Sequence, residues 1–349
     1  MAGQNSTPSR SPRADDLDLL KTLLVIGMVG THVVQLLSFR LKGTANVVWQ
    51  DYANLISFSG YMFAFGIGLG LPKPEGRVRT LWQRLRPILL LLLAAWVSSF
   101  AFALLVDRKP LNADLIIDVM SFRRLFGWSE FLASFFVLAI FTTFLRAPLL
   151  AIGRNPWALV LVSALALAST LITIDAMIPL AGTLIGHTQY ASFPLLAYLP
   201  WFLLGIWYGT NRLRLWHFVP ALAATALFFY MAARTGEYPG RFPPTALWVA
   251  GPALFLLGYL ALTRWFCARV TLPRWVLLPG QHVLSFLIVS NLLIFAGRYL
   301  FNRPVRAEWV ALLVTVLMLG AITLGWVLWQ RWRKAGRPAS AARAGAAAQ

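Results

Sequence analysis

The chain has 349 residues, of which 59% are hydrophobic and only 12% are charged, and its mean hydropathy is +0.68. A soluble domain carries about twice this charged fraction, so the composition excludes an ordinary soluble protein and indicates an all-α, polytopic integral membrane protein. The net charge of +19 does not indicate a nucleic-acid partner, because the basic residues form short clusters between apolar segments, as in membrane-protein loops. The single cysteine excludes an internal disulfide.

Ten apolar segments of about twenty residues, the length that a bilayer core requires, follow one another along the chain. They cover residues 17–39, 51–71, 87–106, 129–146, 157–174, 194–209, 215–233, 245–262, 276–297 and 308–330. We therefore expect one transmembrane domain over residues 17–330. The polar residues 1–16 should form a disordered cytoplasmic tail before a signal-anchor helix, because no small-residue cleavage site follows the first segment. The basic, low-complexity residues 331–349 should form a second cytoplasmic tail.

Clustered Lys and Arg residues favour one orientation of these segments. With the N-terminus inside, most of the 31 Lys and Arg residues fall in the two tails and in alternate loops, which the positive-inside rule assigns to the cytoplasm. Both termini are then cytoplasmic. The other basic residues gather in the predicted outside loops 107–128, 234–242 and 298–308, which suggests that these loops do more than connect helices.

The first apolar segment contains three ionisable residues, Asp18, Lys21 and His32. On a helix they share one face, with Lys21 and His32 roughly 16 Å apart along the axis. Ionisable groups inside a span are costly and mark pathways or catalytic sites, and a histidine takes up and returns a proton near neutral pH. The alternatives are a hydrogen bond from His32 to a neighbouring helix and a snorkelling ion pair between Asp18 and Lys21.

These residues resemble motifs of the acyltransferase-3 superfamily of transmembrane acyltransferases, and the resemblance extends from about residue 16 to residue 330. The opening helix of that family reads Leu-Asp-x-Leu-Arg, ten residues, then His. Asp18 and His32 match this pattern, whereas Lys21 replaces the arginine. The second segment resembles the family's Phe-rich segment through Ser59–Tyr61, and Arg84–Pro87 is similar to the basic motif before the third.

Later segments also resemble the family. Trp128 and Glu130 stand in a segment similar to its Trp-Phe-Leu segment, and residues 198–209 resemble one that ends in Gly before a cytoplasmic turn. The stretch RFPPTALWVAG, which begins at Arg241, is similar to the Pro-Pro-Ser-like entry to a late span in sugar-modifying relatives. Asn291 ends a segment that usually ends in His. Because asparagine hydrogen-bonds but does not shuttle protons, we assign it no acid–base role.

The resemblance implies a reaction in the plasma (inner) membrane. An acyl group, acetyl or succinyl, would pass from cytoplasmic acyl-CoA to a hydroxyl of a glycan, a lipid-linked sugar or a similar cell-envelope acceptor. His32 and Asp18 are the expected catalytic residues, with His32 taking the proton of the acceptor hydroxyl. Lys21 would organise the donor entrance together with Asp18. Arg84 and Arg86 would bind the donor's phosphates.

The acceptor would meet the outside loops. Arg123, Arg124 and Arg241 would attract an anionic acceptor, although basic residues also keep loops soluble. Glu130 either pairs with Arg123 or Arg124, or binds the acceptor. Direct transfer and an acyl-enzyme intermediate both stay open.

Two other classes of function also stay open. One is a membrane transporter or exporter of a small polar or lipid substrate, and the other is a non-catalytic relative of the same fold. The sequence contains no metal-ligand cluster, no CxxC motif and no glycine-rich nucleotide loop, so we expect no metal and no tightly bound cofactor. We expect His187 to be solvated in an outside loop. The glycines at positions 66, 68 and 70 predict close helix packing.

Overall fold

The computed structural model describes residues 12–39, 43–72, 80–175, 180–188, 191–301, 305 and 307–335, with the side chains of all but residues 12–14 and 334–335. Helices form the regular structure of these residues, in which β-structure is limited to isolated bridges. The all-α prediction is confirmed.

Each of the ten apolar segments is largely helical. The helices are α1 (Pro12–Leu37), α2 (Ala45–Gly70), α3 (Leu81–Leu105), α5 (Ser129–Phe144), α7 (Pro156–Ala168), α8 (Leu195–Thr210), α9 (Phe218–Thr235), α10 (Ala246–Ala250) with α11 (Ala253–Cys267), α12 (Arg274–Gln281) with α13 (Val283–Leu300), and α14 (Glu308–Ala335). By length and composition, seven helical stretches of the described chain are able to cross a bilayer. The number is eight if α5 and α6 (Arg146–Arg154), which meet at 90°, form one bent span. The protein is a multi-pass membrane protein, while the count of ten spans and their orientation stay predictions.

Two features differ from the predicted segments. The ninth segment is broken at His282, between α12 and α13, and Pro279 inside α12 removes a helical hydrogen bond just before this break. The first outside loop contains a short helix, α4 (Ala113–Met120). Asn112 caps it, because its Oδ1 accepts a hydrogen bond of 2.9 Å from the backbone N–H of Leu115.

The ends of the chain and one histidine also differ from expectation. Helix α1 already begins at Pro12, and α14 continues to Ala335, so helix extends into both predicted tails. The prediction of a solvated His187 is wrong, since this residue is 1% exposed. A β-bridge to Ile174 holds its backbone inside the loop between α7 and α8.

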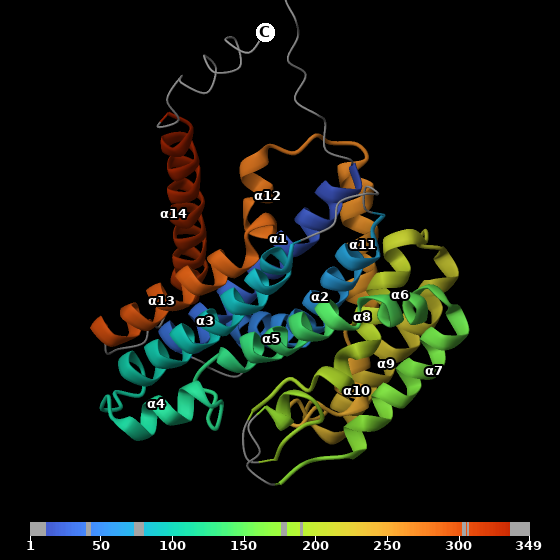
Figure 1. Ribbon diagram of the computed structural model, residues 1–349, viewed down its shortest axis with the longest axis horizontal. Helices are drawn as coiled ribbons and strands as arrows, with labels where there is room; N and C mark the ends of the chain where they lie inside the picture. The colour runs from blue at the N-terminus through green and yellow to red at the C-terminus, as the bar shows by residue number, and fades with distance from the viewer. Residues whose placement is uncertain are drawn as a thin grey trace, which may run out of the picture.

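Helices α1, α2 and α8 form the centre of the molecule (Figure 1). Where α2 crosses α8, a Cβ atom added to Gly66 would collide with the carbonyl oxygen of Phe202, and one on Gly70 would collide with that of Ile206. The predicted close packing is therefore confirmed at these two glycines. At Gly68, by contrast, an added Cβ would make only an ordinary van der Waals contact with the side chain of Leu17.

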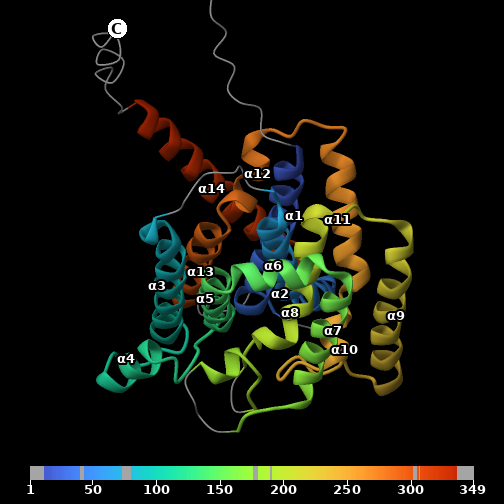
Figure 2. The same ribbon diagram turned by 45° about the vertical axis from the view of Figure 1, so that its right-hand side comes forward.

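The peripheral helices have apolar faces that no other helix covers. In the most apolar windows of α9 and α14, only 17% and 11% of the residues are buried, and α14 tilts away from the other helices in Figure 2. Such faces suit contact with lipid. The beginning of α1 and the end of α14 lie at one end of the molecule, whereas α4 and α10 lie at the opposite end.

Candidate functional site

His32 lies inside the helical core, about one and a half turns before the end of α1 at Leu37. The residue is 7% exposed, and its Nδ1 donates a hydrogen bond of 2.9 Å to Oδ1 of Asn291 on α13. A proton on Nδ1 leaves the lone pair on Nε2, so Nε2 is able to accept a proton. The hydrogen bond to a neighbouring helix, considered above as an alternative to catalysis, therefore also orients a base.

Trp128 covers the imidazole of His32. The two rings are parallel, with their centroids 3.5 Å apart and their planes at 4°, and the Trp128 Nε1 donates a 2.8 Å hydrogen bond to Oε1 of Gln35. Gly127 precedes this tryptophan with φ +61, which side-chain-bearing residues rarely adopt, and a Cβ there would collide with the ring of Phe102. This turn at the start of α5 thus places the ring of Trp128 against His32.

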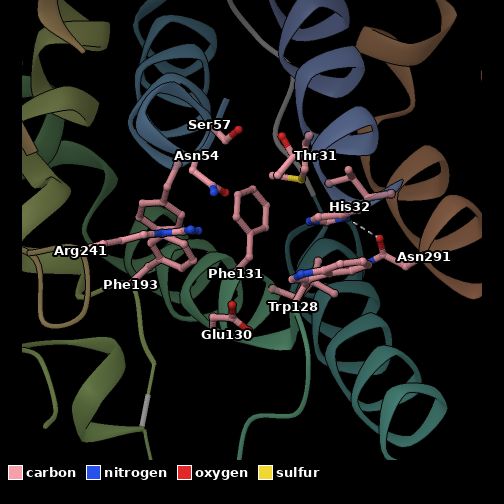
Figure 3. A pocket seen from close by; sticks show the side chains of 14 residues that line it. Thr31, His32, Asn54, Ser57, Trp128, Glu130, Phe131, Phe193, Arg241 and Asn291 are labelled. Atoms are coloured by element: carbon pink, nitrogen blue, oxygen red, sulfur yellow. Dashed lines mark hydrogen bonds between the residues drawn. The ribbon is translucent and has the colours of Figure 1, made fainter. Parts of the chain in front are cut away.

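His32 and Trp128 line an internal cavity of about 30 Å³, measured as space open to the centre of a water-sized sphere. That is room for about one or two water molecules. Helices α1, α2, α5 and α13 form its walls, together with the segments before α8 and α10 (Figure 3). The polar and charged groups around His32 in this cavity are Thr31, Asn54, Ser57, Glu130, Arg241 and Asn291.

Glu130 lies in the first turn of α5 and is 7% exposed. The positive end of the helix dipole favours a carboxylate at this position. The structure brings Glu130 into the cavity of His32, but it does not bring Arg123 or Arg124 there. Both arginines are exposed, and Arg124 instead pairs with Asp118, with 3.5 Å between Nε and Oδ2. Among the described residues, no ion pair joins Glu130 to either arginine.

Arg241 reaches the cavity from the loop between α9 and α10. Its guanidinium lies 5.5 Å from the ring centroid of Phe193 and 4.7 Å from that of Phe242. The Nε atom is buried and has no hydrogen-bond partner among the described residues. Burial lowers the pKa of Arg241, while the nearby groups of Tyr198 and Glu130 raise it. An arginine keeps its charge at neutral pH under such conditions.

Asp18 and Lys21 lie far from this cavity. They form an ion pair, with 2.8 Å between Nζ and Oδ1, and Asp18 is about 21 Å from His32 along the axis of α1. The structure therefore does not bring together the two predicted catalytic residues. Lys21 instead lines a second hollow of about 290 Å³, between α1, α2, α3 and α5. Pro87 of α3 lines the same hollow.

The predicted phosphate-binding residues lie in the first turns of α3. Arg84 and Arg86 are both exposed, and Arg86 directly precedes Pro87 of the second hollow. The two arginines thus stand beside the hollow that Lys21 lines, and on the same side of the molecule as the Asp18–Lys21 pair.

A layer of aromatic rings separates the two hollows. Phe131 lines the cavity of His32, and Phe135, one turn further along α5, lines the second hollow. Their ring centroids are 4.8 Å apart. Phe58 and Tyr61 of α2 pack against Phe131 with centroid distances of 5.5 Å and 5.3 Å. In the described structure, both hollows therefore lie along α5 on either side of rings that pack edge-to-face and at a tilt.

Sequence reasoning missed the contribution of α2 to the site. Asn54 and Ser57 line the cavity, one helical turn apart, and Asp51 precedes them by a further three residues. A polar residue at every third position of an apolar helix was a signal that could have identified this face. Among the described residues, no group of three or more His, Cys, Asp or Glu side chains could hold a metal ion.

Comparison with known proteins agrees with the motifs. A model of the acyltransferase-3 type, described as an acyltransferase domain, matches residues 15–330. Neither curated proteins nor solved structures contain a significant match. The family match covers most of the chain, including both hollows and every helix that lines them. The chain belongs to the acyltransferase-3 family and is a membrane acyltransferase.

Proposed function

We propose that the protein transfers an acyl group, acetyl or succinyl, from cytoplasmic acyl-CoA to a hydroxyl of a glycan or another cell-envelope acceptor. The observation that carries this proposal is the orientation of His32. Asn291 holds the proton on Nδ1, Trp128 covers one face of the ring, and Nε2 is left as the basic nitrogen of a buried cavity.

His32 acts as the general base in this reaction. Its Nε2 takes the proton of the acceptor hydroxyl while the oxygen attacks the carbonyl carbon of the thioester. The carbon–sulfur bond then breaks, the new ester stays on the acceptor, and the proton passes from Nε2 to the departing CoA sulfur. Glu130 lines the same cavity and binds hydroxyl groups of the acceptor.

The donor uses the second hollow. Lys21 lines it, and Arg84 and Arg86 stand beside it with exposed guanidinium groups that suit the phosphates of acyl-CoA. Asp18 holds Lys21 in place through their ion pair. In the predicted orientation this hollow lies on the cytoplasmic side of the plasma membrane, where acyl-CoA is found. The cavity of His32 lies nearer the outside loops.

Purified full-length protein in lipid nanodiscs, radiolabelled acetyl-CoA and extracted cell-envelope glycans test the proposal. We expect label to appear on the glycan, and we expect His32→Ala to lower the rate about 10²- to 10⁴-fold, the usual contribution of a general base. Mass spectrometry of envelope glycans and lipids from cells with and without the gene identifies the acceptor and the acyl group.

His217→Ala is the matched control, since His217 is partly exposed and lies outside the cavity. It should leave transfer unchanged. Full activity of a folded His32→Ala variant would contradict the assignment of the base. Movement of a substrate across proteoliposomes, without acyl transfer or CoA binding, would favour a transporter instead.

A further inference from the structure

The cavity of His32 contains a cation without a counter-ion at ion-pair distance. Among the described residues, no carboxylate lies within 4.0 Å of the Arg241 guanidinium, and its buried Nε lacks a hydrogen-bond partner. Asp51 and Glu130 act on Arg241 only through longer-range electrostatics. Arg241 is only partly exposed, and a charge withdrawn from water without a paired or hydrogen-bonded partner is expensive, so this arginine is poorly satisfied by the protein alone.

The surroundings of Arg241 hold the guanidinium in one place. The rings of Phe193 and Phe242 lie on it at cation–π distances of 5.5 Å and 4.7 Å. Phe193 is itself 4% exposed, so the arginine rests on a rigid wall of the cavity. Figure 3 shows its guanidinium directed into the space between α2 and α5. Such a preorganised, planar donor group binds the two oxygens of a carboxylate or phosphate in a bidentate manner.

We propose that Arg241 selects acceptors that carry an anionic oxyacid group, a carboxylate or a phosphate, beside the hydroxyl that is acylated. The inference rests on the proposed function, because it names the acceptor class of the same site. Arg241 is a specificity-determining residue, and it takes no part in the proton transfer of His32.

The donor phosphates do not account for this cation. The residues that suit these phosphates lie near the beginnings of α1 and α3, on the far side of the aromatic layer from His32. They are Lys21, Arg84 and Arg86. Arg241 instead belongs to the loop between α9 and α10, at the end of the molecule opposite the beginning of α1. An anionic acceptor in the cavity would meet Arg241 on one side and His32 on the other.

Phe131 sets the geometry that the acceptor must satisfy. Its ring lies between Arg241 and His32 in Figure 3, and the cavity of about 30 Å³ is too small for a sugar ring. The Phe131 side chain must therefore turn aside when an acceptor binds. A sugar whose anionic group and reactive hydroxyl lie on different carbons would then replace the phenyl ring between the two residues.

Three soluble probes that share one sugar ring test the proposal: methyl glucoside, methyl glucuronoside and methyl glucoside 6-phosphate. Their binding to full-length protein in nanodiscs is measured by calorimetry. We expect at least one anionic probe to bind about ten- to a hundredfold more tightly than the neutral one, the range of a charge-assisted hydrogen-bonded pair. The two anionic probes distinguish a carboxylate from a phosphate.

Variants of Arg241 separate charge recognition from folding. Arg241→Gln should remove the preference by weakening binding of the anionic probes about ten- to a hundredfold, whereas Arg241→Lys should keep part of the preference. Arg234→Gln is the matched control, because this arginine ends α9 on the same side of the molecule but is exposed. Thermal unfolding of each variant in detergent shows whether it is folded.

Two results would overturn the inference. The first is wild-type protein that binds the anionic probes no more tightly than the neutral one, which includes binding none of them. The second is a preference that survives in folded Arg241→Gln. Failure of the proposed function is recognised separately, since anion preference would then persist while acetyl-CoA neither binds nor donates its acyl group.

Discussion

Asn291 shows how a residue without acid–base chemistry takes part in the site. It occupies a position where the family usually has His, and its amide oxygen accepts the Nδ1 proton of the catalytic candidate. A neutral imidazole carries one ring proton, so this hydrogen bond decides which nitrogen is basic. In the proposed mechanism, Asn291 is a positioning residue whose effect on the reaction passes through His32.

We expect Asn291→Ala to lower kcat about tenfold, because one hydrogen bond that orients the base is lost, and to leave KM for acetyl-CoA unchanged. Asn291→Asp should recover most of the rate, since its carboxylate accepts the same hydrogen bond. Steady-state kinetics with both variants provides the measurement. An increased KM with normal kcat would place Asn291 in donor binding instead.

The candidate site was only partly predictable from the sequence. His32 was identified because ionisable residues in apolar segments are unusual, and Glu130 because its segment resembles one of the family; both line the cavity. The hydrogen bond to Asn291 and the stacking on Trp128 were not predicted, since they join α1 to α13 and α5 across the fold. Helical periodicity describes one helix at a time and does not tell which faces meet.

Glycines mark a close helix contact where α2 crosses α8. Gly66 and Gly205 face each other, and a Cβ on Gly205 would collide with the carbonyl oxygen of Phe63. Neither backbone is able to withdraw without disturbing the centre of the molecule. Since Phe58 and Ser57 of α2 line the cavity, this crossing also fixes one wall of the site.

Gly66→Ala should therefore destabilise the fold by about 3 kcal/mol, a typical cost of overpacking a tight core. The change is measured by denaturant unfolding in detergent micelles. Gly258→Ala is the control, because nothing lies within 4 Å of a Cβ at Gly258, and it should unfold like the wild type. Equal stability of the two variants would show that the α2–α8 contact adapts easily.

At the level of elements, hydrophobicity predicted where helices form but not how they end or bend. The ten apolar segments all contain helix, because their length and composition dominate the local energetics. The break at His282 and the 90° bend between α5 and α6 were not predicted. At the first of these, Pro279 removes a helical hydrogen bond, and the adjacent Gly280 lies against the backbone of Asp18 on α1, a contact that periodicity along one helix does not reveal.

For the whole molecule, the position of the helix ends bears on which end faces the cytoplasm. The beginning of α1 and the end of α14 lie at the same end of the molecule, which agrees with an even number of spans. The positive-inside rule places that end in the cytoplasm, and the donor hollow would then open toward acyl-CoA. Orientation and mechanism are therefore tested together.

A pair of engineered cysteines that flank α9 checks the orientation, in a Cys267→Ser background that removes the single native thiol. Arg212 and Arg234 are both exposed, before and at the end of α9. A membrane-impermeant maleimide added to intact cells should label Arg234→Cys but reach Arg212→Cys only after the membrane is permeabilised. Labelling in the reverse order would invert the topology and put the donor hollow on the wrong side.

The aromatic layer between the two hollows has a consequence for the membrane as a whole. An enzyme that takes its donor from one compartment and serves an acceptor in the other contains a route along which ions could leak. In the described structure, the edge-to-face and tilted rings of Phe58, Tyr61, Phe131 and Phe135 interrupt that route, and the cavity of His32 has room for only about one or two water molecules. We therefore expect the resting enzyme to be electrically insulating. Acyl groups would cross one at a time, while the ion gradients that power the cell are preserved.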